Sequence, residues 1–216
     1  MRAVGIGAGG HAKVLLEALL AQGDVEVVGL LDSDPELKGT SVLGVKVLGG
    51  DDLLEQLHRD GVRHAFMGVG GIGDNSMRRR LFEWVKKSGF ELISVRHASA
   101  ILSPSAHIGE GTCLCPGAIV GAGARLGLNV IVNTGAIVEH DCDLGDHVHI
   151  ASGAVLAGGV VVGQGAHVGA GASVKQGVRI GRNAIVAMGA AVVDDVPDDA
   201  VVAGVPARPM QARAKA

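Results

Sequence analysis

The chain has 216 residues, of which 48% are hydrophobic and 19% are charged, and its formal net charge at pH 7 is -3. This composition allows a buried core in one large or two modest domains, and the small charge argues against bulk binding to nucleic acid or to an anionic membrane. The sequence contains no run of 18 apolar residues, so we expect no membrane-spanning helix. Met1 and Arg2 lead at once into a strand pattern rather than a signal peptide, so we expect a cytoplasmic protein.

The N-terminal 98 residues alternate short apolar runs with amphipathic segments. We expect strands at 2–6, 26–31, 65–69 and 91–95, and helices at 11–20, 51–59 and 77–88. A hairpin or edge strand is expected at 42–48, and Asp74 or Asn75 is expected to cap the last helix. Strands that alternate with helices indicate a parallel sheet covered on both faces. The sequence therefore predicts an α/β, Rossmann-like domain over residues 1–98.

A glycine-rich turn joins the first expected strand to the first helix. Residues 5–10, Gly-Ile-Gly-Ala-Gly-Gly, match the pattern G-x-G-x-x-G, and Asp32 lies at the end of the second expected strand. Such glycines let the backbone approach a diphosphate, and the helix N-terminus offers free N–H groups. Asp32 can accept hydrogen bonds from ribose hydroxyls. The turn predicts a nucleotide site that need not take NAD, with a tight turn that binds nothing as the alternative.

From Leu102 to Val196 the chain follows a fixed period of six residues. An aliphatic residue recurs every sixth position, with a small or β-branched residue four places later. The aliphatic positions are Leu102, Ile108, Leu114, Val120, Leu126, Val132, Val138, Leu144, Ile150, Leu156, Val162, Val168, Val174, Ile180, Val186 and Val192. A strand period of two can hold such a repeat on one face, whereas a helix period of 3.6 cannot. We predict a parallel β-helix, three units to the coil, rather than a glycine- and alanine-rich linker.

The β-helix domain is expected over residues 99–207, with a C-terminal tail at 208–216 that frays after Pro209. All three cysteines, Cys113, Cys115 and Cys142, fall inside the repeat, which suits packing in a reducing compartment better than a disulfide framework. A prism with three flat sides exposes apolar residues, and a homotrimer would cover them. The residues expected to be exposed in this way are Ile119, Ile131, Ile137 and Val161.

Three histidines, His140, His147 and His149, lie within ten residues of the repeat. His140 comes two places after the inward Val138, near a corner where its side chain can face outward. An outward imidazole suits a general base. Strict strand alternation would send Asp141 to the opposite side, so only the geometry of the corner can bring its carboxylate to His140.

Five short stretches stand out together across nearly the whole chain. They are Gly7-Ala8-Gly9-Gly10-His11-Ala12-Lys13, Ser103-Pro104-Ser105-Ala106, Asn133-Thr134-Gly135-Ala136, Glu139-His140-Asp141-Cys142 and Gly204-Val205-Pro206-Ala207. Together they resemble the hexapeptide-repeat sugar O/N-acetyltransferases. That family includes sialic acid O-acetyltransferase, UDP-4-amino-sugar N-acetyltransferase and GDP-perosamine N-acetyltransferase.

The resemblance implies a left-handed β-helix and a homotrimer that transfers an acetyl group from acetyl-CoA, without a metal. The acceptor would be the amino group of a UDP- or GDP-linked 4-amino-deoxy sugar. His140 would be the general base, Asp141 would support it and Asn133 would assist. Nucleotide-sugar contacts would come from Gly9, Gly10, His11, Asp32, Ser33 and Gly70, in a site closed by the loop at 70–75. Acetyl-CoA contacts would come from His149, Gly158, Ala170 and Met188.

Other functions stay open at this point. O-acetylation of sialic acid or another sugar is the close alternative, and the residues do not decide between UDP, GDP and CMP. A trimeric zinc hydratase of the carbonic anhydrase type would use three histidine ligands, but that class usually lacks an N-terminal nucleotide-type domain. A non-catalytic nucleotide sensor and a Rossmann-type oxidoreductase are the remaining alternatives.

Overall fold

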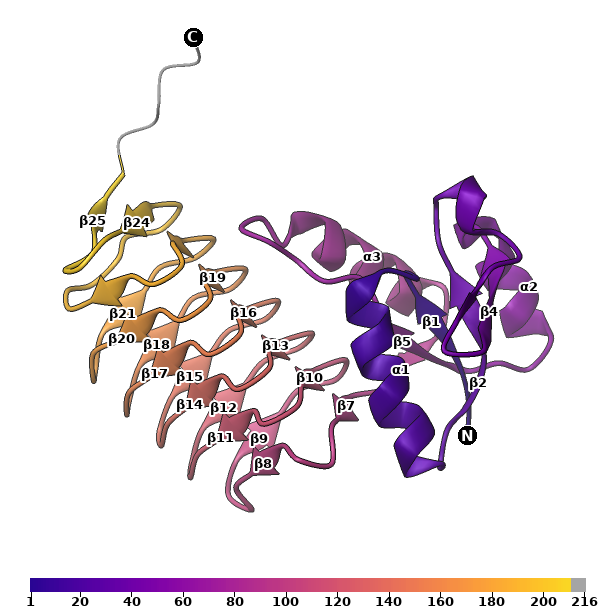
Figure 1. Cartoon of the computed structure of the whole chain (residues 1–216), viewed down its shortest axis with the longest axis horizontal. Coiled ribbons are helices and arrows are strands. Elements are labelled where there is room, and N and C mark those ends of the chain that lie inside the picture. Colours follow the sequence, from indigo (N-terminus) through magenta and orange to yellow (C-terminus); the bar gives the residue numbers. More distant parts are fainter. Residues whose placement is uncertain (211–216) are drawn as a thin grey trace, which may run out of the picture.

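The computed structural model describes residues 1–210 and has two regions, an α/β region followed by a prism of stacked coils (Figure 1). The fraying expected after Pro209 therefore concerns mainly residues 211–216, which lie outside the described residues. Among the described residues, none of the helices is both long and apolar enough to cross a bilayer.

The α/β region is built on one sheet with the strand order β3-β4-β2-β1-β5-β6. Its strands are β1 (Arg2–Ile6), β2 (Glu26–Leu31), β3 (Ser41–Val42), β4 (Val45–Gly49), β5 (His64–Met67) and β6 (Glu91–Leu92). Its helices are α1 (Gly10–Gln22), α2 (Leu54–Arg59) and α3 (Ser76–Lys87), with 3₁₀ turns at Pro35–Leu37 and Asp51–Leu53. All pairs are parallel except the β3–β4 hairpin. The expected alternation of strands and helices is confirmed, except that the strand expected at 91–95 is divided: Glu91–Leu92 joins this sheet, whereas Val95 belongs to the next region. The strand order reverses between β1 and β5, where open α/β sheets bind ligands.

Helices α1 and α3 pack apolar stripes against this sheet. The stripe of α1 contains Ala12, Leu15, Leu16, Ala18 and Leu19. In α3 the buried positions are Arg78, Phe82 and Val85, which are spaced i, i+4 and i+7 on one side of the helix. An arginine therefore occupies a core position in a helix that is otherwise amphipathic.

The C-terminal region is a left-handed parallel β-helix with three faces (Figure 1). The first face contains β7 (Val95–Arg96), β10 (Cys113–Leu114), β13 (Ile131–Val132), β16 (His149–Ile150), β19 (His167–Val168), β22 (Ile185–Val186), β24 (Val201–Ala203) and β25 (Arg208–Pro209). The second face contains β8 (Ile101–Leu102), β11 (Ile119–Val120), β14 (Ile137–Val138), β17 (Val155–Leu156), β20 (Ser173–Val174) and β23 (Ala191–Val192). The third face contains β9 (His107–Ile108), β12 (Arg125–Leu126), β15 (Asp143–Leu144), β18 (Val161–Val162) and β21 (Arg179–Ile180).

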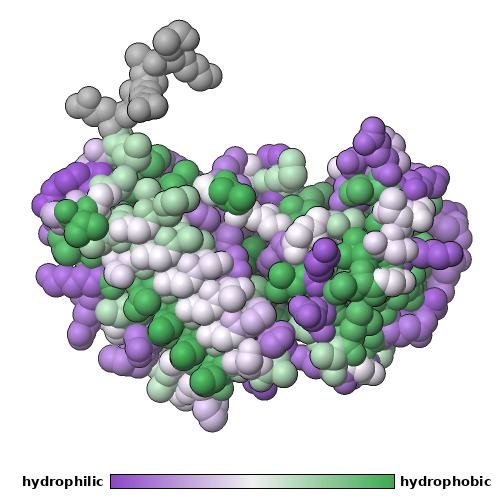
Figure 2. Space-filling view, in the orientation of Figure 1, coloured by the Kyte–Doolittle hydropathy of each residue, from purple (hydrophilic) through white to green (hydrophobic). Residues whose placement is uncertain are grey.

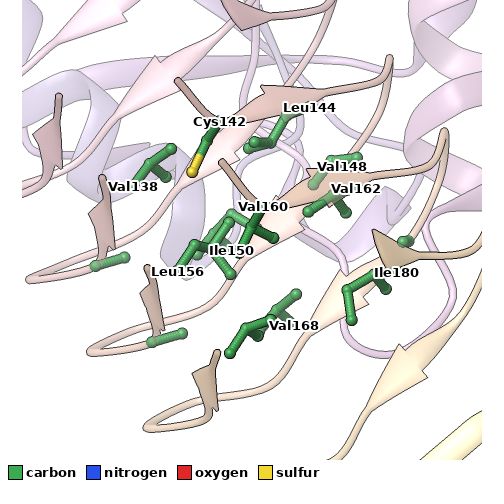
Figure 3. Packing of buried hydrophobic residues seen from close by; sticks show 14 of the residues in the cluster. Val138, Cys142, Leu144, Val148, Ile150, Leu156, Val160, Val162, Val168 and Ile180 are labelled. Atoms are coloured by element: carbon green, nitrogen blue, oxygen red, sulfur yellow. The ribbon is translucent and has the colours of Figure 1, made fainter. Parts of the chain in front are cut away.

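The core of the β-helix is a column of the aliphatic residues that the six-residue period predicts. Figure 3 shows Val138, Leu144, Ile150 and Leu156 pointing into it from successive strands. Cys142 also points into this column, which confirms its packing role.

The chain turns at three corners, which we name by the faces they join. The first corner joins the first and second faces, the second corner joins the second and third, and the third corner joins the third and first.

Both ends of the β-helix depart from the period. β7 pairs with β10, so the coils begin before Leu102, and Arg96 occupies the register position opposite the inward Leu114. Because this position holds a charged residue instead of an aliphatic one, the six-residue pattern does not predict the strand. At the other end β24 pairs with β22 as Ile185 with Val201, a 16-residue step, and β25 folds back antiparallel onto β24. The division of the chain at residue 98 stays a prediction.

The α/β region lies against the first face of the β-helix. Ile131 was expected to be exposed, and this is wrong, since it is only 1% exposed. Its register neighbours Cys113 and His149 both contact the α/β region, which explains the burial. Ile119 and Ile137 are half-buried on the second face, and Val161 is half-buried on the third.

Candidate active site

The glycine-rich turn leaves an open surface at the N-terminus of α1. Gly7 has a φ of +98°, and a Cβ there would lie 2.6 Å from Cγ2 of Val69, so only glycine fits. By contrast, a Cβ at Gly9 or Gly10 would meet nothing within 4 Å. Gly9 and Gly10 are exposed, and the first N–H groups of a helix lack helical partners, so the start of α1 is open to an anion.

Asp32 holds this turn in place and borders a cavity. Its Oδ2 accepts a hydrogen bond from the N–H of Ala8 at 2.7 Å, and its Oδ1 accepts one from Asp34 at 3.0 Å. The adjoining cavity has a volume of about 270 Å³ and is lined by Ile6, Gly7, Leu31, Asp32, Ser33, Asp51, Val69, Met77, Arg80 and Leu81. Burial raises the pKa of Asp51, and the negative charges of Asp32 and Asp52 add to this effect. The predicted Asp32 and Ser33 thus share a pocket with Asp51, which the sequence did not single out.

The loop between β5 and α3 crosses from the α/β region to the β-helix. The carbonyl of Gly71 accepts a hydrogen bond from Nδ1 of His149 at 2.7 Å. Asn75 occupies the N-cap position of α3, as one of the two expected alternatives, but its side chain makes no capping hydrogen bond: its Nδ2 instead lies 3.2 Å from the carbonyl of His147 and 3.3 Å from that of Gly165. The side-chain hydrogen bonds at this helix start come from Asp74, which accepts from the N–H and the Oγ–H of Ser76. The loop is therefore attached to the coils at both ends.

Arg78 is buried at the same junction. Its Nη1 donates to the carbonyls of Met67, at 2.9 Å, and Val69, while its Nη2 lies 3.4 Å from the carbonyl of Gly111 and 3.5 Å from Sγ of Cys113. Met67 ends β5 and Val69 lies just beyond it, whereas Gly111 and Cys113 belong to the β-helix. Burial lowers the pKa of this guanidinium, which is held by carbonyl dipoles rather than by a carboxylate. Arg78 therefore fixes the α/β region relative to the β-helix.

A second cavity of about 690 Å³ lies between the two regions. It is lined by His11, Gly70, Gly71, Ile72, Asp74, Ser76, Met77, Arg80, Asn133 and His149. A Cβ on Gly70 would lie 3.4 Å from Cβ of His11. Four predicted site residues from distant parts of the sequence, His11, Gly70, Asn133 and His149, therefore meet in one cleft.

His149 is neutral and its tautomer is fixed. Because Nδ1 contacts a carbonyl, it carries the proton, and Nε2 accepts from Nδ2 of Asn133 at 3.1 Å. Burial, with smaller effects of His167 and Arg78, lowers the pKa of His149 to about 3. Burial likewise lowers the pKa of His11 to about 3, and Nε2 of His11 has no hydrogen-bond partner within residues 1–210.

His140 and Asp141 lie at the second corner of the β-helix. Asp141 has a φ of +57°, and this left-handed conformation returns its carboxylate to His140, with Oδ2 2.8 Å from Nδ1. Asp141 therefore fixes the proton on Nδ1, and Nε2 of His140 faces outward as an acceptor. One coil further on, a Cβ at Gly158 would lie 2.5 Å from Cε1 and Nε2 of His140. Only glycine at position 158 leaves room for this imidazole.

The predicted residues thus fall into two groups on one chain. Asn133, Ala170 and Met188 lie in turns of the first corner, beside His149 on the first face, whereas His140, Asp141 and Gly158 lie at the second corner. Backbone hydrogen bonds between equivalent turns of successive coils align the residues of each group. The N–H of Gly189 donates to the carbonyl of Ala170, and the N–H of Gly159 donates to the carbonyl of His140. The three clustered histidines separate as well, since His147 lies at the third corner. Within residues 1–210 of one chain, no three His, Cys, Asp or Glu side chains form a group that could hold a metal ion.

Comparisons with known proteins agree with this geometry. A family model described as the PglD N-terminal domain matches residues 4–85. PerB from Caulobacter crescentus, solved in complex with CoA and GDP-perosamine, is 42% identical, with 98% of each chain covered and a TM-score of 0.90. The chain belongs to the hexapeptide-repeat sugar acetyltransferase family.

Two further members of the sugar acetyltransferase family are similar. The acetyltransferase domain of PglB from Neisseria gonorrhoeae FA1090, solved with acetyl coenzyme A, is 39% identical, covers 97% of this chain and 98% of that one, and has a TM-score of 0.90. UDP-N-acetylbacillosamine N-acetyltransferase from Bacillus subtilis (strain 168) is 40% identical over 109 residues. That match spans 50% of this chain and about half, 48%, of the relative.

The buried state of His149 predicts acid sensitivity in this family member. The unfolded chain takes up a proton here near pH 6.5, whereas folded His149 resists protonation down to about pH 3. The contribution of His149 to the free energy of unfolding is therefore fully present above pH 6.5. It falls as the pH is lowered toward 3, by up to about 1.4 kcal/mol per pH unit.

Urea unfolding at fixed protein concentration, between pH 6.5 and pH 4, measures this slope. His149→Gln should give a shallower slope than the wild type, whereas His107→Gln, at an exposed position on the third face, should leave it unchanged. Equal slopes for the wild type and His149→Gln would contradict the prediction.

Proposed function

We propose that the protein is an acetyl-CoA-dependent N-acetyltransferase that acts on the amino group of a nucleotide-linked amino sugar. The observation that carries this proposal is that two cavities adjoin and share part of their lining, one at the ligand-binding edge of the α/β sheet and one that ends at the β-helix. Met77 and Arg80 line both of them. A ligand that places a nucleoside in the first cavity can therefore extend its sugar into the second. PerB is described with CoA and GDP-perosamine, which have this chemistry.

The walls of the larger cleft suit a sugar. Half-buried His11 lines the cleft, and its solvent-shielded Nε2 has no hydrogen-bond partner within residues 1–210, so a sugar hydroxyl or amine would satisfy this atom once the ring turns toward the cleft. Asn133 and the neutral His149 add polar atoms at the end near the coils. Both co-substrates, a nucleotide sugar and acetyl-CoA, are cytoplasmic metabolites, so the proposal places the protein in the cytoplasm.

His140 is the proposed general base. As the sugar amine attacks the acetyl carbonyl, Nε2 of His140 takes one proton from nitrogen, the C–S bond breaks, and CoA leaves as the thiol once it regains a proton. Asp141 stabilises the imidazolium through the 2.8 Å contact at Nδ1. The reaction needs no covalent enzyme intermediate. All three cysteines are buried, and burial raises the pKa of Cys115 to about 12, so their thiols are poor nucleophiles.

A homotrimer is part of the proposal. Ile101, Ile119, Ile137 and Val155 occupy the outward positions of neighbouring strands on the second face. Figure 2 shows a diagonal row of hydrophobic surface over these strands. Such a row is covered when copies of the chain associate around a threefold axis. Association also allows the second corner of one subunit to meet the first corner of its neighbour, which would join His140 to Asn133 and His149.

A substrate screen tests the function. UDP-, GDP- and CMP-sugars, each with and without a 4-amino group, are incubated with acetyl-CoA, and free thiol and acetylated product are measured. We expect thiol release only with an amino sugar linked to UDP or GDP. Transfer to hydroxyl sugars alone would identify an O-acetyltransferase, and nucleotide binding without thiol release would identify a sensor.

A further inference from the structure

Arg80 lies where the two cavities meet. It is on the second turn of α3, and with Met77 it is one of the two residues that line both the 270 Å³ pocket and the 690 Å³ cleft. Met77 is apolar, so Arg80 is the polar side chain common to both spaces. Any ligand that passes from Asp32 and Ser33 toward Asn133 and His149 passes Arg80.

The charge of Arg80 is available for a ligand. Within residues 1–210, ion pairs engage Arg79 with Glu83 and Lys86 with Glu110, whereas no carboxylate lies within ion-pair distance of Arg80. Its Nη1 makes one long hydrogen bond, 3.4 Å, to Oγ of Ser76. Arg80 is also the sole permanent cation among the residues that line the two cavities, since His11 and His149 are neutral.

We infer that Arg80 binds the diphosphate that links the nucleoside to the sugar. This inference rests on the proposed function, because a nucleotide sugar carries its two phosphates between the groups assigned to the two cavities. Asp32 and Asp51 line the first cavity and Asp74 lines the second, so a diphosphate placed between them without a cation would meet only like charge. A guanidinium can bind phosphate oxygens through two parallel N–H donors, so Arg80 can hold two oxygens of the diphosphate at once.

Lys13 is the competing cation. It lines a separate space of about 340 Å³ with Ala8, Gly9, Gly10, Ser41, Val42 and Leu43, on the hairpin side of the turn. Lys13 lines neither of the two adjoining cavities. A diphosphate held by Lys13 would therefore lie outside the cavities that contain Arg80, Asn133 and His149. The two assignments therefore predict different mutants with weakened binding.

Calorimetry on the full-length protein separates them. The probes are guanosine, GMP and GDP, and uridine, UMP and UDP, so that affinity is measured as phosphates are added to each base. For the base that binds, Arg80→Gln should weaken diphosphate binding at least about tenfold and leave nucleoside binding unchanged. The matched control is Arg79→Gln, one residue away on the same helix, which lines the opposite side of the loop with His147 and Asn183 and should bind like the wild type.

The outcomes are distinct. Three results would overturn the inference but leave the proposed function standing. Arg80→Gln could bind the diphosphate with wild-type affinity, or it could lose affinity equally for nucleoside and diphosphate. Alternatively, Lys13→Gln alone could lose affinity in proportion to the number of phosphates. If neither GDP nor UDP binds the wild type, the proposed function fails and the inference fails with it. Arg80 is exposed, so unchanged thermal unfolding of Arg80→Gln serves as the check on folding.

Discussion

Replacing His140 with alanine should lower the rate of acetyl transfer at least about a hundredfold, because a general base contributes about 10² to 10⁴ in rate. The oligomer and its thermal unfolding should stay as in the wild type. The side chain of His140 is 57% exposed, so its removal opens no cavity in the core, unlike the loss of the fully buried Val138. Initial rates at saturating substrate and a melting curve measure the two parts.

Two neighbouring variants sharpen this test. Asp141→Asn keeps the imidazole but weakens support of its charged form, so we expect a smaller loss than in His140→Ala. Gly158→Ala keeps both residues and places a methyl group where the His140 ring lies, so we expect a loss in kcat without a loss in stability. If His140→Ala retains more than about a tenth of the wild-type rate, His140 is not the base.

Mixing two inactive variants should restore activity, because each half of the proposed site comes from a different subunit. His140→Ala removes the second-corner half and Asn133→Ala removes the first-corner half. In trimers assembled at random from equal amounts, about a quarter of the subunit junctions combine an intact second corner with an intact first corner. We therefore expect recovery of about a quarter of the wild-type rate after subunit exchange.

A same-corner mixture is the control for that experiment. His140→Ala and Gly158→Leu both damage the second corner, so no junction between them is intact and no activity should return. Absence of recovery in the first mixture, with subunit exchange shown by mass spectrometry of tagged chains, would mean that the site does not span two subunits. Light scattering that shows a stable monomer at micromolar concentration would contradict the trimer itself.

Much of the fold follows from local sequence patterns. The six-residue period fixes which residues point inward, since strand alternation and a constant coil length leave one arrangement, and the structure confirms it from Leu102 to Val192. The pattern fails where packing between distant segments decides. Ile131 is at the outward position of its strand but is covered by the α/β region. Arg96 is at the inward register position of β7, so the aliphatic repeat does not reveal that strand.

The candidate site was predictable in its parts but not in its arrangement. His140, Asp141 and the glycine turn are visible as motifs, but strand alternation alone would separate Asp141 from His140, and only its left-handed φ brings them together. Arg78 and Arg80 are two of three consecutive arginines in the sequence. The i, i+4, i+7 spacing of Arg78 with Phe82 and Val85 is a signal that one of the three is buried. No local signal shows that Arg80 borders two cavities, because their walls come from six separate segments.

The constant coil length has a consequence for how this chain can change in evolution. Insertion of one hexapeptide between Asn133 and His140 would keep every later aliphatic residue inward, yet it would advance His140 from the second corner to the third. We therefore expect the core to tolerate length changes in multiples of 6, whereas only a multiple of 18 would keep His140 at the second corner. Even a full 18-residue insertion moves the two halves about 4.8 Å apart along the axis. In lineages of such chains, insertions that preserve folding should therefore accumulate after the last functional coil rather than within it.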